Sequence, residues 1–376
     1  MNISGGKKMK KSLSLFLIAL MVVALIVTGC GQKPAEPTKP QEPPKPVYKA
    51  GFIYVGPIGD GGWTFAHNEG RKYLEAQLKI PTLYKESVPE SQEVEKVISD
   101  MIDQGANIIF ATSFGYMDYV EKVAAKYPNV KFFHCSGYKT APNMTNYFGK
   151  IEEARYLSGI VAGLKTKSNK LGYVAAYEIP EVVRGINAFA LGVRSVNPKA
   201  TVEVVWTHTW YDPAKEKEAA KALLSKGVDI IAQHQDTAGP QQAAEEKGVW
   251  SIGYNTDMAA TSPKAYMTAP IWNWGLYYVK AVKSVMDGTW NNTPYLGDTK
   301  DGLVALAPLT AIAPANAKEK VDAASADIVS GKNLIFTGPL KDNTGTLRIK
   351  AGETMSIADQ YSIFDWFVAG VIGKVK

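Results

Sequence analysis

The stretch Gly-Ala-Asn-Ile-Ile-Phe at residues 105–110 recurs as Gly-Val-Asp-Ile-Ile-Ala at residues 227–232, which is 122 positions later. Each stretch has the pattern of a turn that leads into a buried strand. The first strand patterns, Gly-Phe-Ile-Tyr at 51–54 and Gly-Tyr-Val-Ala at 172–175, are 121 positions apart. Because a nearly constant offset indicates an internal repeat, the sequence predicts two similar α/β lobes.

Short apolar runs alternate with amphipathic segments over residues 50–255. This alternation predicts two doubly wound, Rossmann-like lobes, each with a parallel sheet covered by helices on both faces. We expect strands at residues 50–56, 82–88, 107–113 and 131–137, and again at 170–177, 201–210, 228–234 and 250–255. We expect helices near residues 63–79, 91–104 and 116–127, and again near 181–196, 213–226 and 238–247.

The chain is expected to cross between the lobes at residues 145–165 and 267–273, the second crossing leading into a helix at 274–286. Two crossings make a hinge, and the cleft beside it collects the carboxyl ends of both sheets. The expected organisation is lobe 1 at residues 48–148 with part of 273–312, and lobe 2 at 149–272 with part of 313–376. Within the last part we expect a hairpin at 337–353 and a helix at 363–372.

The N-terminal segment has the pattern of an export signal. A cationic start at residues 7–11 precedes an apolar run from Leu13 to Val27, which is too short to span a membrane. The sequence Val27-Thr-Gly-Cys30 resembles the bacterial lipobox, so residues 1–29 are predicted to be removed and Cys30 to carry a lipid. The alternative is an uncleaved membrane anchor. Prolines throughout residues 31–47 predict an extended linker, which would tether the lobes to the outer face of the cytoplasmic membrane.

The charge and composition exclude several classes of protein. The chain has 42 Lys and Arg against 36 Asp and Glu, but four of the lysines lie within residues 7–11. No basic stripe remains elsewhere, so we expect no nucleic-acid partner. With two cysteines and four histidines, a cysteine-rich scaffold or a zinc array is excluded, and we expect no metal.

The first strand-to-helix loop is the most informative candidate site. It reads Gly-Pro-Ile-Gly-Asp-Gly-Gly-Trp-Thr-Phe-Ala-His-Asn-Glu-Gly at residues 56–70, and it fits no Gly-x-Gly-x-x-Gly register. Phosphate-bearing cofactors are therefore disfavoured, and we expect no cofactor. Asp60 belongs to a sharp turn, Thr64 is a candidate helix cap, and Trp63 is interpreted as a platform for a ligand. The alternative for Trp63 is a core aromatic that closes the end of the sheet.

The sequence resembles the basic membrane protein (BMP) family over residues 48–288. The resemblance is carried by this loop, by the crossing Phe-Gly-Lys-Ile-Glu-Glu-Ala-Arg-Tyr-Leu-Ser-Gly at 148–159 and by the stretch Thr-Trp-Tyr-Asp-Pro-Ala-Lys-Glu-Lys-Glu at 209–218. Members are substrate-binding lipoproteins of ABC transporters. The resemblance implies a monomeric receptor of the type I periplasmic-binding-protein class, which takes a purine nucleoside or base and delivers it to permease subunits. It implies that the purine is gripped by Trp63 and an aromatic of lobe 2, for which Tyr177 is the candidate, and that Asp257 holds ribose hydroxyls.

The sequence departs from the family pattern at two places. Residues 269–274 read Ala-Pro-Ile-Trp-Asn-Trp where a lysine is usual, and residues 234–238 read His-Gln-Asp-Thr-Ala where a Gly-rich loop is usual. These departures favour a bare base such as adenine over a nucleoside. The predicted ligand-binding residues are Asp60, Trp63, Thr64, Phe114, Tyr177, Glu178, Gln235, Asn255, Asp257, Trp272 and Asn273. Ser113 and Asp236 are further candidates for contacts to the ring edge, and for every edge group the alternative is a helix cap or a turn residue.

Other functions remain as alternatives. They are a nucleoside or sugar receptor of the same architecture, a sensor that presents its ligand to a membrane kinase, and a nucleoside hydrolase or phosphorylase. The sequence has no Gly-x-Ser-x-Gly elbow. The histidines at 134 and 208 are interpreted as packing residues, and His67 either lines the cleft or belongs to a helix surface. We therefore expect a binding protein and not an enzyme.

Overall fold

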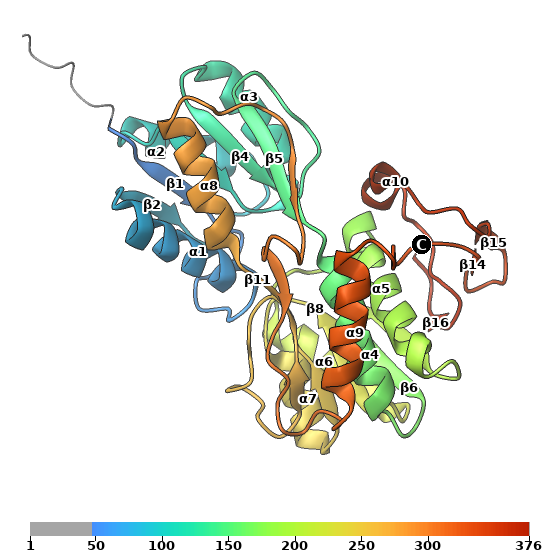
Figure 1. Ribbon diagram of the computed structural model, residues 1–376. Helices are drawn as coiled ribbons and strands as arrows, with labels where there is room; N and C mark the ends of the chain where they lie inside the picture. Colours follow the sequence, from blue (N-terminus) through green and yellow to red (C-terminus); the bar gives the residue numbers. More distant parts are fainter. Residues whose placement is uncertain (1–46, 376) are drawn as a thin grey trace, which may run out of the picture. The chain divides into compact units, whose positions relative to one another are not determined.

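Six parallel strands form the first sheet of the computed structural model, which describes residues 47–375. The strand order is β12-β5-β4-β3-β1-β2 (Figure 1). The strands are β1 (Ala50–Ile53), β2 (Thr82–Lys85), β3 (Ile108–Ala111), β4 (Lys131–Cys135), β5 (Met144–Gly149) and β12 (Tyr295–Gly297). The helices of this half are α1 (Trp63–Leu78), α2 (Glu93–Asp103), η1 (Phe114–Tyr116), α3 (Met117–Lys126) and α8 (Trp274–Met286).

The second sheet also has six parallel strands, in the order β10-β9-β8-β6-β7-β16. They are β6 (Lys170–Ala175), β7 (Thr201–Trp206), β8 (Ile230–His234), β9 (Trp250–Ile252), β10 (Tyr266–Thr268) and β16 (Val371–Ile372). The helices of this half are α4 (Ile151–Lys165), α5 (Pro180–Val196), α6 (Pro213–Ser225), α7 (Gly239–Lys247) and α9 (Ala317–Val329). The prediction of an α/β protein with parallel sheets is confirmed.

The internal repeat has a packing reason. The order β2-β1-β3-β4-β5 in the first sheet corresponds to β7-β6-β8-β9-β10 in the second. Gly51 and Gly172 occupy equivalent places in the central strands, and a β-carbon on Gly51 would lie 2.8 Å from the sulfur of Met101 on α2. A β-carbon on Gly172 would lie 3.0 Å from Leu223 on α6. The repeated glycine thus allows two equivalent helices, α2 in the first half and α6 in the second, to approach the central strands of their sheets closely.

The two sheets are connected through a short antiparallel pair, β11 (Pro270–Trp272) with β13 (Val304–Leu306). The segment 145–165, expected as a crossing, contains β5 followed by α4, so the first sheet has a strand there that sequence periodicity did not reveal. Helix α8 follows β11 and packs against α1 (Figure 1). The chain therefore returns to the first half after completing most of the second sheet.

The C-terminal part contains the predicted hairpin, as β14 (Leu340–Lys341) and β15 (Leu347–Ile349), but not the predicted helix at 363–372. Helix α10 (Ile357–Ser362) ends before it, and β16 pairs with β7. Phe364, Phe367 and Val368 are buried at helix-like spacing. However, the side chain of Asn187 hydrogen-bonds the backbone of residues 366 and 368, and these bonds replace the helical ones.

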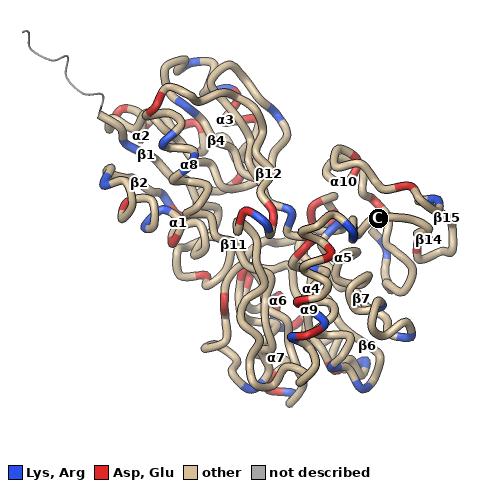
Figure 2. Tube along the Cα trace, in the orientation of Figure 1, with Lys and Arg blue, Asp and Glu red and all other residues tan. Residues whose placement is uncertain are grey.

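Acidic and basic residues are interspersed along both halves (Figure 2). Among the helices of residues 47–375, none has the length and apolar character needed to cross a membrane. The predicted signal segment 1–29, Cys30 and the linker up to residue 46 lie outside the described residues.

Candidate functional site

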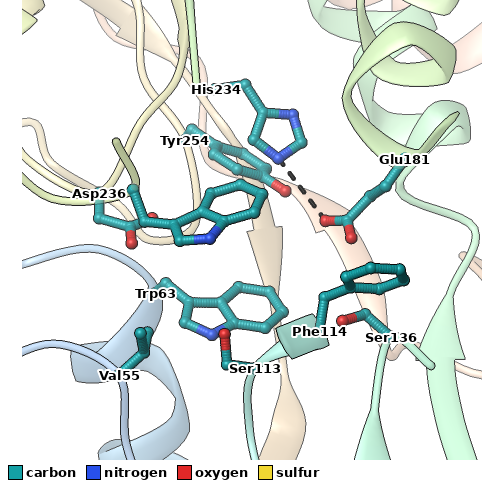
Figure 3. A pocket seen from close by; sticks show the side chains of 10 residues that line it. Val55, Trp63, Ser113, Phe114, Ser136, Glu181, His234, Asp236 and Tyr254 are labelled. Atoms are coloured by element: carbon teal, nitrogen blue, oxygen red, sulfur yellow. Dashed lines mark ion pairs between the residues drawn. The ribbon is translucent and has the colours of Figure 1, made fainter. Parts of the chain in front are cut away.

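A cavity lies where the loops after the strands of the two sheets meet (Figure 3). The space between its lining residues, including the part open to solvent, is about 340 Å³. The first half contributes residues that follow β1, β3 and β4, and the second half contributes residues that follow β6 to β9. The lining residues are Val55, Trp63, Ser113, Phe114, Ser136, Glu181, Trp210, His234, Asp236 and Tyr254.

Trp63 forms part of the cavity wall, and a hydrogen bond and two other tryptophan rings fix its position. Its indole Nε1 donates a hydrogen bond of 2.7 Å to the carbonyl oxygen of Thr112. Its ring meets Trp272 and Trp274 edge-on, with centroid distances of 5.8 and 5.6 Å. Only 9% of Trp63 is exposed, so the residue both lines the cavity and packs as a core aromatic. The two interpretations of Trp63 are therefore not exclusive.

Asp60 and Thr64 position Trp63 and do not line the cavity. The Asp60 carboxylate accepts hydrogen bonds from the backbone N–H groups of Gly62, Thr64 and Phe65 at 2.8 to 2.9 Å. The Thr64 hydroxyl accepts one from the N–H of Gly56 at 3.1 Å. The Asp60 bonds satisfy free N–H groups at the start of α1, the role considered as the alternative for Asp60, whereas Thr64 is the second residue of α1 and its hydroxyl bonds the preceding loop instead of capping the helix. Burial raises the pKa of Asp60 to about 6, and the three N–H bonds oppose that rise.

The second half supplies a continuous aromatic wall. The His234 ring lies 4.6 Å from Tyr254 and 6.3 Å from Trp210, measured between centroids. The predicted residue Tyr177 contacts Trp210 edge-on at 5.0 Å but is not part of the lining. Figure 3 shows Trp63 and Phe114 on one side of the space, and Tyr254, His234 and Glu181 on the other. A flat ligand in this cavity touches rings from both halves.

Glu181 and His234 form the main polar contact of the second wall. Glu181 is the second residue of α5, and its Oε1 lies 3.6 Å from Nε2 of His234. Burial lowers the pKa of His234 to about 4, so the imidazole is neutral at physiological pH. The pair then presents a carboxylate and a neutral ring nitrogen to a ligand, which is hydrogen-bonding chemistry without a fixed positive charge.

A buried cation supports this wall from outside the cavity. Arg155 on α4 is fully buried, and its guanidinium lies 3.6 Å from the centroid of the Tyr254 ring. Its Nη1 donates a 2.6 Å hydrogen bond to the carbonyl oxygen of Gln233, the residue before His234. Arg155 thereby holds both Tyr254 and the end of β8 in place.

Asp236 is a buried carboxyl at the junction of the two halves. Its Oδ1 accepts a 3.2 Å hydrogen bond from Nδ2 of Asn255. Burial raises the pKa of Asp236 well above its ordinary value, and the charges of Asp60 and Glu216 raise it further. Burial also raises the pKa of Glu216 to about 7. We call this group of buried carboxyls, Asp60, Asp236 and Glu216, the acidic junction; each has a raised pKa, and Asp236 lines the cavity.

Of the predicted ligand-binding residues, the structure brings Trp63 and Phe114 to the cavity, together with the edge candidates Ser113 and Asp236. The other predicted residues have different partners. Gln235 bonds Thr207, Glu178 lies 3.4 Å from His208, Asn255 joins Asp236 to Trp272, and Asn273 bonds the Gly302 carbonyl. Asp257 is exposed and lies, with Trp272 and Asn273, along a separate surface groove.

Sequence reasoning missed Val55, Ser136, Glu181, Trp210, His234 and Tyr254. Trp210 was missed because residues 201–210 were read as one strand. Strand β7 ends at Trp206, and His208 has a left-handed backbone with φ 54°, so Trp210 turns into the cavity. Tyr254 similarly lies two residues beyond β9. The rule that ligands lie beyond the carboxyl ends of strands would have found both residues, had the strand ends been placed correctly.

Comparisons with known proteins identify the relatives of this chain. The family model described as ABC transporter substrate-binding protein PnrA-like matches residues 47–344. A purine-binding protein from Brucella abortus is 43% identical over 331 residues, covering 87% of this chain and 93% of the relative. A protein named as an ABC transporter glucose-binding protein from Haloferax volcanii is 39% identical over 290 residues, covering 77% of this chain and 74% of the relative.

Solved structures share the fold. A solute-binding protein of an ABC transporter system from Conexibacter woesei superposes with a TM-score of 0.65 at 24% identity, covering 76% of this chain and 97% of that one. A solute-binding protein from Aeropyrum pernix gives 0.67 at 19% identity, covering 84% and 95%. The family match spans most of the chain. The chain therefore belongs to the PnrA-like family of ABC transporter substrate-binding proteins, the family that its motifs resemble, and is an exported solute receptor and not an enzyme.

Proposed function

We propose that this receptor captures a free purine base, adenine being favoured, and delivers it to its ABC permease. The observation that carries the proposal is the pair of aromatic walls. Trp63 and Phe114 come from the first half, and Trp210 and Tyr254 come from the second, around one cavity of about 340 Å³. Stacking of a base on an aromatic ring contributes roughly 1–3 kcal/mol. The 43% identical Brucella relative, named as a purine-binding protein, supports the same ligand class.

The polar lining suits the edge of a purine. Glu181 and Asp236 offer oxygen atoms, while Ser113 and Ser136 offer hydroxyl groups. The Ser113 hydroxyl donates to Glu90 at 2.6 Å, which leaves its lone pairs to accept from a ligand. A buried edge group left unpaired costs about 1–3 kcal/mol, so these groups discriminate among ring compounds.

A base is favoured over a nucleoside for two reasons. Asp257, which the family resemblance assigns to ribose hydroxyls, lies outside the cavity. No Lys or Arg is among the lining residues, so no cation is available to bind ribose oxygens. We assign Trp272 and Trp274 a role different from the sequence-based expectation, because they pack against Trp63 and are not among the lining residues of the cavity.

The closing motion follows from the two-sided cavity. A ligand shifts the equilibrium between open and closed forms only if it binds one form better, and rings from both halves meet such a ligand only when the halves are together. We further propose that the receptor is a monomer, with lobes bounded as the sequence analysis places them, and that it is tethered to the membrane by a lipid on Cys30.

Mass analysis of the solute released by denaturing the purified protein tests the ligand class, and calorimetry with adenine and adenosine tests the finer assignment. We expect a purine in the released fraction and tighter binding of adenine than of adenosine. Tighter binding of adenosine would contradict the base assignment. Heat with glucose and none with either purine would favour the sugar chemistry named for the Haloferax relative.

A further inference from the structure

A second hollow lies behind Trp63 and is distinct from the ligand cavity. We call it the outer groove, and it encloses about 810 Å³. Trp272 and Trp274 form its base, Phe65 and Tyr73 of α1 and Leu276 of α8 form its apolar sides, and Asp257 lies at its rim.

The sides of the outer groove are unusually apolar for an exposed surface. Phe65 is 37% exposed, Tyr73 43% and Leu276 45%. Single exposed apolar residues need no explanation, but three around one concave surface are typical of an interaction site. Aromatic side chains at the centre of such a surface provide much of the energy of protein–protein association.

The base of the groove is in direct contact with the ligand platform. Trp272 and Trp274 stack on each other with a centroid distance of 4.5 Å and an interplanar angle of 15°. Trp63 meets both rings edge-on, at angles of 85° and 81°. Trp63 and the stacked pair Trp272–Trp274 therefore lie between the cavity and the outer groove.

The outer groove is also built from both halves of the protein. Helices α1 and α8 belong to the first half, whereas Thr256 and Asp257 follow β9 of the second sheet. The Thr256 hydroxyl donates a hydrogen bond to the carbonyl oxygen of Gly61, which joins the two halves beside the groove. Separation of the halves breaks this contact and removes one rim, so the complete groove exists only in the closed form.

The charge of the rim indicates the chemistry of the partner. Its acidic lining residues are Glu69 and Asp257, and the lining includes no Lys or Arg. Glu69 is paired with Lys72 at 2.7 Å, whereas the Asp257 carboxylate accepts a hydrogen bond of 3.1 Å from the backbone N–H of Ala259 and interacts with the hydroxyl of Tyr266, neither of which is a cation. An apolar segment with a flanking cation complements such a surface.

We propose that the outer groove is the surface by which the ABC permease recognises the closed, loaded receptor, through an exposed apolar loop flanked by Lys or Arg. A transporter avoids wasteful cycles if its permease responds only to loaded receptor. Closure completes the outer groove, and the rings at its base contact Trp63. The groove therefore allows the permease to discriminate loaded from empty receptor. The inference rests on the family role as an ABC receptor and not on the identity of the ligand.

The test measures the ATPase activity of the cognate permease in nanodiscs, stimulated by receptor that retains the solute it carries from the cell. We expect Leu276→Glu to reduce stimulation at limiting receptor at least tenfold, because the charge lies among apolar side chains. Asp257→Lys should reduce it severalfold by reversing the rim charge. Native mass spectrometry checks that each variant retains the same fraction of bound solute.

Ile363→Glu is the matched control, because Ile363 is 59% exposed and is not part of the groove. It should stimulate the permease as the unchanged protein does. Equal stimulation by Leu276→Glu and the control, with solute retained, overturns the proposal. Loss of a concentration-dependent dimer in Leu276→Glu, with stimulation unchanged, also overturns it and assigns the groove to a second copy of the chain. If the solute carried by the receptor is not a purine, the proposed ligand class is wrong, but the comparison of permease stimulation between Leu276→Glu and Ile363→Glu still tests the groove.

Discussion

The two walls of the ligand cavity differ in chemistry. The wall from the first half consists of Trp63 and Phe114 with two serine hydroxyls, and it contains no ionisable lining residue. The wall from the second half combines Trp210 and Tyr254 with Glu181, His234 and Asp236. The first wall therefore offers apolar area on a ring that is already fixed, while the second offers hydrogen bonds whose strength depends on protonation.

This difference suggests a division of roles. A pre-positioned ring loses little conformational freedom when a ligand stacks on it, so the first wall contributes affinity for any flat ring. The second wall discriminates, because its buried polar groups penalise a ligand that fails to pair with them. Closure brings the two walls together, and they meet where the Asp60–Trp63 loop contacts the loop at Asp236.

Removing the main ring of the first wall has the largest expected effect. Trp63→Ala should lower the free energy of unfolding of the ligand-free protein by about 3–5 kcal/mol, because it leaves a cavity against Trp272 and Trp274. It should also weaken adenine binding by about 1–3 kcal/mol. Denaturant unfolding and calorimetry measure the two losses separately.

Trp63→Phe is the control for this pair of effects. It keeps a ring toward the ligand but removes the indole N–H that bonds the Thr112 carbonyl. We expect it to retain more affinity than the alanine variant. Unchanged affinity in Trp63→Ala, with only stability lost, would show that the first wall does not contact the ligand.

The contact between the walls can be broken without altering either of them. A β-carbon on Gly62 would lie 2.2 Å from the carbonyl oxygen of Asp236, a distance that side-chain movement cannot relieve. Gly62→Ala should therefore oppose closure and weaken ligand binding by roughly 1–3 kcal/mol. Calorimetry on the two variants Gly62→Ala and Gly59→Ala measures this effect.

Gly59 belongs to the same loop, and a β-carbon there meets no atom within 4 Å, so Gly59→Ala should bind as the unchanged protein does. Equal affinities for the two variants would mean that the ligand does not require the close approach at Gly62.

The sequence predicted the first wall better than the second, and the reason is physical. Trp63 is recognisable because it follows a short strand and a glycine-rich turn, which are local signals. Trp210 and Tyr254 depend on where β7 and β9 end, and those ends are fixed by sheet pairing and by the left-handed backbone at His208 and Asn255. Strand ends are weakly encoded in local sequence.

The polar residues show the same limit. Asp60, Gln235 and Asn255 lie in the expected loops, yet they bond to backbone or to other side chains. Glu181 faces the cavity from the first turn of α5, where an acidic residue is common for helix stability alone. Position beyond a strand identifies the loop, but the direction of each side chain follows from tertiary packing. The architecture of the two sheets was predictable because the repeat and the alternation extend over residues 50–255.

The acidic junction of the second wall predicts a moderate dependence on pH. Asp236 faces Asp60, Glu216 and Glu181, and burial together with these charges raises its pKa. A carboxyl whose pKa is raised by closure holds its proton more tightly in the closed form, so protonation favours closure and a rise in pH opposes it. Because Asp60 and Asp236 belong to different halves, closure brings their charges together, and affinity should increase about threefold to tenfold from pH 8 to pH 6, the upper side of the Asp60 pKa of about 6.

Calorimetry across this range, in buffers of different ionisation enthalpy, measures both the affinity and the proton uptake. Asp236→Asn should flatten the profile, whatever it does to the affinity itself. The pKa of His234 is about 4, below this range, so the imidazole stays neutral throughout. Affinity that rises with pH in the unchanged protein would contradict the assignment.

The smallest expected effect is at Asp257, where the role implied by the family resemblance and the position in this structure disagree. The resemblance assigns this residue to ribose hydroxyls, whereas the structure places it on an exposed loop at the outer groove. Asp257→Ala should change the affinity for adenine by less than about twofold, as for other exposed substitutions away from a site. It should also leave the ratio of adenine to adenosine affinity unchanged, because neither ligand reaches the carboxylate from the cavity. Calorimetry with both ligands gives that ratio, and a selective loss of adenosine binding would mean that a riboside extends past the walls to Asp257.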